Sequence, residues 1–252
     1  MLFYLLSFVS LTLFAHALFG GKEVDSESNS FNFTVKIDGS KGTCTGTLVH
    51  KSWVLTAAHC LPENSNEELR ITHGSVHTHP TPEESLSVRF SKGFEAFGAD
   101  NMTDDNVGLI ELSVAIDSDT VVLSRRHRPP GNVLYTAGFG QNVDHANQHP
   151  AGLTKVMFTV SADSLCDVFA SSSNSSSTIG CFFDEDKFYT TGDTGGPVVL
   201  EEDSQFLQIA VSGDVNFDPV TWEISPPSLF TYISDACDWI AAKTVGEVKC
   251  VD

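Results

Sequence analysis

Short runs of β-branched and aromatic residues recur along the whole chain, and turn-forming residues separate them at short intervals. This spacing is typical of an all-β sandwich or barrel and does not fit strands that alternate with long helices. The predicted strands lie at residues 33–37, 46–49, 53–55, 107–112, 155–160, 197–200 and 206–211. The sequence therefore predicts an all-β fold.

One helix is predicted, close to the C-terminus. Ser234 is a good N-cap residue, and Asp235 and Asp238 follow it in the first turns, where a negative charge stabilises the positive end of the helix dipole. Trp239 and Ile240 would form the apolar face of this helix. We expect the helix to begin directly after Ser234.

The first 17 residues are apolar and carry no charged side chain, and Ala15-His16-Ala17 is a small-x-small cleavage signal. These features predict a secretory signal peptide over residues 1–17. No later stretch reaches the roughly 18 consecutive apolar residues that a membrane helix needs. We therefore expect a mature chain that is secreted, extracellular and without a membrane partner.

The six cysteines of the chain are an even number in a sequence expected to leave the cell. Because the extracellular space is oxidising, this number predicts three structural disulfides. A thiol left for pairing with another molecule is the alternative. The sequence also holds three N-glycosylation sequons, at Asn32, Asn101 and Asn174, and two loop-like segments, at residues 63–68 and 171–178.

The chain is strongly acidic, with 14 Lys and Arg against 33 Asp and Glu and a net charge of −19. Such a chain is repelled by phosphate backbones and by anionic membrane surfaces, so neither nucleic acid nor membrane is an expected partner. The charge serves solubility, or steers a basic partner surface. The nine histidines show no metal-ligand spacing, so neither a metal nor an organic cofactor is expected.

Two motifs suggest nucleophilic chemistry. Leu-Thr-Ala-Ala-His-Cys ends at Cys60, and Thr-Gly-Asp-Thr-Gly-Gly-Pro ends at Pro197. Together with the strand at 107–112 and with Ala-Gly-Phe-Gly at 137–140, they make the chain resemble the trypsin-like serine proteases over nearly its whole mature length. The resemblance implies two packed six-stranded antiparallel β-barrels, at 18–125 and 126–252, with a C-terminal α-helix. The basic, proline-containing segment 124–131 would link the two barrels.

The resemblance implies a catalytic triad that is altered at two of its three positions. His59 matches the general base of the family, but Thr194 stands where the family has a serine nucleophile, and Asn106 stands where it has an aspartate. Serine protease chemistry needs a carboxylate that holds the imidazole in the correct tautomer, which an amide cannot supply. The alternative is that a bulge brings Asp105 into the aspartate position.

The resemblance also assigns the residues around the triad. The amides of Gly192 and Thr194 would form the oxyanion hole, and signal cleavage would free the amino group of Leu18 to pair with Asp193. Leu18-Phe19-Gly20-Gly21 is similar to the sequence that opens an activated member of the family.

The primary specificity pocket would contain Phe188, Ser212 and Ser228. Phe188 stands where the family has an acidic or small polar residue, and Thr190 replaces a cysteine of the pocket wall. A bulky ring and a missing disulfide predict a filled or reshaped pocket. The alternative is that Phe188 swings away in a looser loop.

For the disulfides, the resemblance implies the pairs Cys44–Cys60 and Cys166–Cys181, which leaves Cys237 to pair with Cys250.

The sequence thus predicts a secreted trypsin-like serine protease homologue with impaired catalysis, which acts by binding or inhibiting another protein. The alternative is a weak serine-type endopeptidase that uses Thr194 as nucleophile with His59 and Asp105. In both cases the partner is a protein or a polypeptide substrate. The sequence does not predict an oligomeric state.

Overall fold

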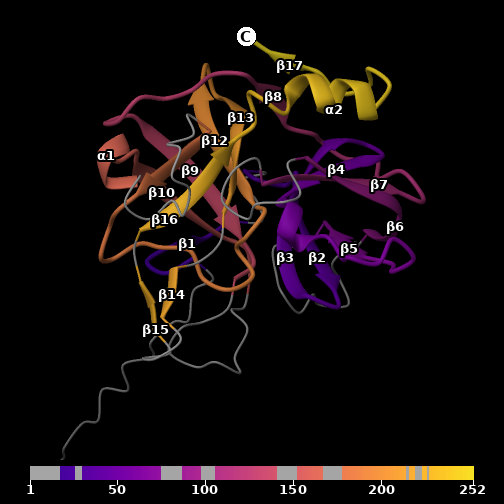
Figure 1. Ribbon diagram of the computed structural model, residues 1–252, viewed down its shortest axis with the longest axis horizontal. Helices are drawn as coiled ribbons and strands as arrows, with labels where there is room; N and C mark the ends of the chain where they lie inside the picture. The colour runs from indigo at the N-terminus through magenta and orange to yellow at the C-terminus, as the bar shows by residue number, and fades with distance from the viewer. Residues whose placement is uncertain are drawn as a thin grey trace, which may run out of the picture.

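The computed structural model describes residues 18–25, 30–74, 87–97, 106–140, 152–166, 178–213, 216–218, 223–225 and 227–252. The predicted signal peptide, Asp105, and the sequons at Asn101 and Asn174 lie outside these residues. The described part of the chain forms two β units that lie side by side, with a short helix at one end (Figure 1).

The first unit is a closed barrel of antiparallel strands. In the order of their hydrogen bonding, its strands are β2 (Thr34–Gly39), β3 (Gly42–His50), β4 (Trp53–Thr56), β7 (Val107–Leu112), β6 (Ser87–Phe97) and β5 (Arg70–His73). Its interior is filled by branched aliphatic side chains that include Val35, Leu48, Ile71 and Ile110. Closure of the barrel leaves none of these strands with an unpaired edge. The six-stranded N-terminal barrel is therefore confirmed.

The second unit is a nine-stranded sheet. Its main path is β1 (Lys22–Glu23), β10 (Thr154–Thr159), β9 (Val133–Gly138), β12 (Pro197–Glu202), β13 (Gln205–Ser212), β16 (Ser228–Tyr232) and β11 (Ile179–Phe182), and β8 (Val122–Ser124) and β17 (Cys250–Val251) attach to it in parallel. Phe158 of β10 and Phe182 of β11 stack at 4.1 Å between ring centroids, so the sheet curves back on itself. The remaining elements are η1 (Ala58–Cys60), α1 (Asp163–Cys166), α2 (Cys237–Lys243) and the hairpin β14 (Asn216–Asp218) with β15 (Glu223–Ser225).

A shared apolar core joins the two units. It contains Leu55 and Leu109 from the first barrel and Val199 and Val211 from the second sheet, all of them buried. Phe139, which directly follows β9, is also part of it. Burial of this many apolar side chains across one interface fixes the relative position of the units. The motifs around His59 and Thr194 are thereby held at the junction between them.

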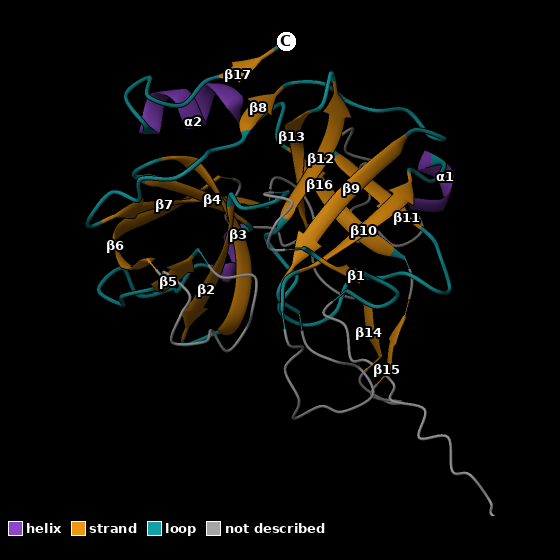
Figure 2. Ribbon diagram, turned by 180° about the vertical axis from the view of Figure 1, so that it is seen from behind, coloured by secondary structure: helices purple, strands orange, loops and turns teal. Residues whose placement is uncertain are grey.

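Helix α2 belongs to the second half of the chain but packs on the first barrel (Figure 2). The ring of Trp239 lies 5.4 Å from that of Phe97 on β6, and Ile240 is fully buried, so the predicted apolar face is confirmed. The predicted start is wrong, because α2 begins at Cys237 and its N-cap residue, Ala236, makes no side-chain cap. The hydroxyl of Ser234 instead bonds the imidazole Nε2 of His127 at 2.6 Å.

The basic linker is tied to the second half of the chain by ion pairs. Arg126 and Arg128 both bond the carboxylate of Glu202, and Arg125 bonds Asp238 of α2. The division of the chain at residues 125 and 126 stays a prediction. Strands β1 and β8 precede this boundary, yet they hydrogen-bond with the second sheet.

All six cysteines are paired as expected. The bonds are Cys44–Cys60, Cys166–Cys181 and Cys237–Cys250. The first ties the turn that carries His59 to strand β3, and the third ties the C-terminal strand to α2.

Candidate active site

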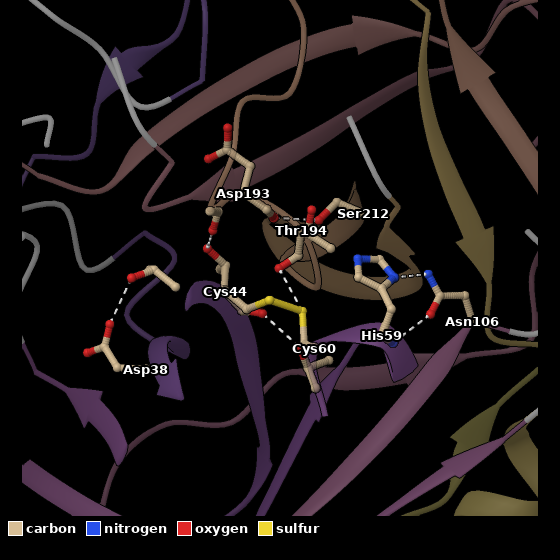
Figure 3. Close-up of a disulfide and its surroundings, with 12 residues drawn as sticks. Asp38, Cys44, His59, Cys60, Asn106, Asp193, Thr194 and Ser212 are labelled. Carbon is tan, nitrogen blue, oxygen red and sulfur yellow. Dashed lines mark hydrogen bonds between the residues drawn. A yellow bond between two sulfur atoms is a disulfide. The ribbon is translucent and has the colours of Figure 1, made fainter. Parts of the chain in front are cut away.

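Asn106 and His59 form a paired contact between the start of β7 and the turn η1. The amide oxygen of Asn106 accepts a hydrogen bond from the backbone nitrogen of His59 at 3.1 Å. Its amide nitrogen lies 2.7 Å from the imidazole Nδ1 (Figure 3). Asn106 is 2% exposed, so its amide is shielded from water, whereas His59 is partly exposed. This geometry places Asn106 against the imidazole, where the sequence predicted it; Asp105 lies outside the described residues.

The two bonds together fix the tautomer of His59. Because the backbone N–H of His59 needs an acceptor, the oxygen of Asn106 must face it and the NH₂ group must face Nδ1. Nδ1 then accepts a hydrogen bond, and the hydrogen of the neutral imidazole is carried on Nε2. An Nε2 that already carries hydrogen cannot take a proton from a hydroxyl nucleophile.

The loop that carries Thr194 is packed against the turn of His59. The carbonyl oxygen of Thr194 accepts from the backbone nitrogen of Thr45 at 2.9 Å and lies 3.7 Å from the sulfur of Cys60. Thr194 is 6% exposed. Gly195, with φ of +84°, must be glycine, because an added Cβ would lie 2.1 Å from the hydroxyl of Thr56. The fold thus brings Thr194 and His59 into one site.

The two amides predicted for the oxyanion hole have no acceptor among the residues that the structure describes. Within the part of the chain that the structure describes, neither Gly192 nor Thr194 donates a backbone hydrogen bond. Gly192 has φ of +103°, in the region that favours glycine, and its carbonyl oxygen accepts from the hydroxyl of Thr45 at 2.8 Å. Such amides are suited to a carbonyl oxygen of a bound polypeptide.

Asp193 is almost fully buried and its carboxylate accepts three hydrogen bonds. Gly140 donates its backbone N–H at 2.8 Å, and Thr190 donates both its backbone N–H, at 2.7 Å, and its hydroxyl, at 2.9 Å. Burial raises the pKa of the Asp193 carboxyl to about 7, although these hydrogen bonds act in the opposite direction.

The N-terminal segment of the described chain docks into the second sheet. The side chain of Leu18 is 1% exposed, and its backbone nitrogen donates to the hydroxyl of Thr154 at 2.8 Å. Phe19 forms a bridge with Phe188, and the two rings stack at 4.4 Å. The ion pair of Leu18 with Asp193 requires a free amino group, which the full chain lacks at this position, and it stays a prediction.

The residues predicted for the primary pocket lie around the base of the same loop. Ser212 donates its hydroxyl to the carbonyl oxygen of Asp193 at 2.7 Å, and the hydroxyl of Ser228 accepts from the backbone nitrogen of Tyr189 at 2.8 Å. Phe188 is 7% exposed. The two serine hydroxyls therefore stabilise the loop backbone, and the filling of the pocket by Phe188 stays a prediction.

Thr45 contributes to the site, and the sequence pattern did not indicate it. It is fully buried and lies between the two units. Its hydroxyl donates to Gly192 O and accepts from Phe139 N at 3.0 Å, and its backbone contacts both Thr194 and Thr56. Its only sequence signal is its place directly after Cys44.

Neither a metal centre nor a membrane span is found in the described ranges. No three His, Cys, Asp or Glu residues there are grouped closely enough to hold a metal ion. Among the same residues, no helix has the length and apolar character needed to cross a bilayer.

Two β units are joined by a shared core, and His59 of the first unit meets the loop of Thr194 of the second at their junction. This fold and this site layout define the serine protease class. A family model described as Trypsin matches residues 18–240, and the chain belongs to this family.

Individual relatives are distant in sequence. The chain is 29% identical over 235 residues to the snake venom serine protease pallabin-2 of Gloydius halys, an alignment that covers 88% of this chain and 85% of that protein. It is 28% identical over 246 residues to granzyme C of Mus musculus, covering 90% of each chain. It is 25% identical over 220 residues to coagulation factor XII of Cavia porcellus, covering 80% of this chain but only 36% of that longer protein.

Proposed function

We propose that this chain is a secreted member of the trypsin family with impaired catalysis, which acts by binding or inhibiting another protein. The family acts on polypeptides, so a protein or a polypeptide segment is the partner that the site favours. The apolar leader at residues 1–17 and the three disulfides support secretion.

One observation carries this proposal: the amide of Asn106 faces Nδ1 of His59 at 2.7 Å while its oxygen is held by the backbone of His59. The amide holds the imidazole in the tautomer that cannot deprotonate a nucleophile. It also provides no negative charge to stabilise an imidazolium. In this enzyme class, replacing the triad aspartate by asparagine lowers turnover by about 10⁴-fold.

Thr194 adds a second obstacle. Its extra methyl group restricts rotation about χ1, and the residue is almost fully enclosed. A hydroxyl with less freedom is harder to align with both an imidazole and an incoming carbonyl. By contrast, the amides of Gly192 and Thr194 remain in place for a peptide carbonyl, which supports binding rather than cleavage.

Cleavage by Thr194 is the second candidate function, because the hydroxyl and the two amides are both retained. The named relatives include proteases, which is consistent with it. It would require a carboxylate beside His59, for which Asp105 is the candidate, in place of the amide that bonds Nδ1.

The experiment compares four proteins that begin at Leu18: wild type, Thr194→Ala, Thr194→Ser, and Asn106→Asp with Thr194→Ser. Each is treated with a fluorophosphonate probe and with a peptide-substrate library. We expect only the double variant to be labelled and to cleave peptides at a rate well above background. Turnover by wild type that Thr194→Ala abolishes would refute the proposal and establish the second candidate.

A further inference from the structure

The carboxylate of Asp193 accepts its hydrogen bonds from Gly140 and Thr190. Both carboxylate oxygens are occupied: Gly140 donates to Oδ1, and the backbone and hydroxyl of Thr190 both donate to Oδ2. The approach is so close that an added Cβ at Gly140 would lie 2.2 Å from the hydroxyl of Thr190. The segment around Gly140 and the nucleophile loop are therefore shaped to each other around this carboxylate.

The N-terminal segment does not take part in these bonds. Position 18 carries a peptide bond in the full chain, and its nitrogen donates to Thr154 on β10. Leu18 is held by apolar burial, Phe19 by its bridge to Phe188, and β1 by pairing with β10. The segment is thus anchored by several contacts that need no free amino group.

Thr45 secures the other end of the loop. One hydroxyl joins Gly192 O and Phe139 N, and the backbone nitrogen of the same residue bonds Thr194 O at 2.9 Å. The carbonyl groups of Gly192 and Thr194 are thereby fixed by one fully buried residue of strand β3. A loop fixed at both carbonyls presents its unbonded amides in one orientation.

We propose that Thr45 and Thr190 are positioning residues that hold the loop from Gly192 to Thr194 in its amide-presenting form without an ammonium group at Leu18. Thr190 stands where the family resemblance has a pocket-wall cysteine, and Thr45 reaches across from the other unit. The amides they position would bind a carbonyl oxygen of an extended polypeptide. The loop would then be ready for a ligand before the leader is removed as well as after. This inference stands apart from the question of catalysis.

The test measures hydrogen exchange of three amides that are bonded inside the loop: Asp193 to Thr190 O, Gly195 to Ser212 O, and Gly196 to Asp193 O. Their exchange reports local opening of the loop and requires neither activity nor a partner. The proteins are wild type beginning at Leu18, the same chain extended by Gly-Ser before Leu18, and variants at Thr45 and Thr190.

The extended protein should exchange these amides within about 2-fold of wild type, because a surface change usually alters stability by no more than about 0.5 kcal/mol. Thr45→Val and Thr190→Val should speed exchange by about 5- to 150-fold, the factor expected when a buried group is left without its hydrogen bond. Thr45→Ser and Thr190→Ser keep the hydroxyl and should restore slow exchange.

A matched control lies on the same strand. Thr47 is also fully buried on β3, but its hydroxyl has no partner in the described part of the chain. Thr47→Val should therefore leave the loop amides unchanged. The inference is overturned if the Gly-Ser extension alone speeds exchange of these amides by about 10-fold or more, the factor expected for loss of a hydrogen bond to a charged group. It is equally overturned if valine and serine variants exchange alike, since packing and not the hydroxyl would then matter.

If the protease assay shows turnover by wild type while the exchange pattern is as expected, the proposed function fails and this inference stands. The reverse result leaves the proposed function standing and removes this inference.

Discussion

The buried carboxyl of Asp193 makes a quantitative prediction about stability and pH. Its pKa in the folded protein is raised by burial to about 7, from an ordinary value of 3.8. A difference of about 3 pKa units corresponds to about 4 kcal/mol of folding free energy. The perturbation is Asp193→Asn, made in the chain extended by Gly-Ser before Leu18, which has no ammonium group at position 18 and serves as the wild type of this comparison.

The sign follows from proton binding. Below about pH 4 the carboxyl is protonated in both states, and it adds no penalty to folding. Between about pH 4 and 7 the unfolded chain releases this proton while the folded chain keeps it, so wild-type stability falls as the pH rises. Above pH 7 the penalty is constant. The free energy of unfolding of wild type, minus that of Asp193→Asn, should therefore fall by about 4 kcal/mol from pH 4 to pH 8.

Urea unfolding followed by tryptophan fluorescence at five pH values measures this difference. The asparagine amide fits poorly among three hydrogen-bond donors, and this costs Asp193→Asn stability. The cost does not depend on pH, so it does not affect how the difference in unfolding free energy changes with pH. Buried His73, whose pKa is lowered by burial, contributes an opposite slope, but equally in both proteins. A difference that stays flat, or that rises with pH, would refute the reasoning, because it would mean that the carboxylate of Asp193 is compensated within the folded protein.

Three further predictions concern stability and are measured by urea unfolding at pH 7. Ile110→Ala, in the fully buried core of the first barrel, should cost about 2–5 kcal/mol; a loss below about 1 kcal/mol would contradict close packing there. Thr47→Val should be neutral or stabilising, by up to about 1 kcal/mol, because its buried hydroxyl has no partner among the described residues; clear destabilisation would reveal a hidden bond. The double change Cys237→Ser with Cys250→Ser should cost about 2–4 kcal/mol, and an unchanged midpoint would show that the terminal strand is held without it.

Much of the fold followed from local sequence patterns. All seven predicted strands are present, because alternation of apolar and polar residues depends only on which face of a strand is buried. The disulfides followed from the family resemblance. The start of α2 did not follow, because Ser234 finds a partner in His127, which lies 107 residues away in the chain.

The candidate site was predictable in position but not in its supporting contacts. Asn106 was placed against His59 from the strand that follows it, since β7 fixes the register. The roles of Thr45 and Thr190 could not be read from the sequence. Thr45 bonds Gly192, which lies 147 residues away and in the other unit. Thr190 bonds Asp193, which is near in the chain, but around a carboxylate that the distant Gly140 also bonds.

The order in which the strands pair has a consequence for synthesis. The strands β2 to β7 are all made once residue 112 has left the ribosome, and they pair only with one another. The second sheet can be completed only much later. Strand β8 pairs with β17 at residues 250–251, and β1 pairs with β10, which follows the whole barrel in the sequence. During synthesis the early half of the chain can close while β1 and β8 still have exposed edges. The disulfide between Cys237 and Cys250 can form only after residue 250 has been made, long after the barrel strands.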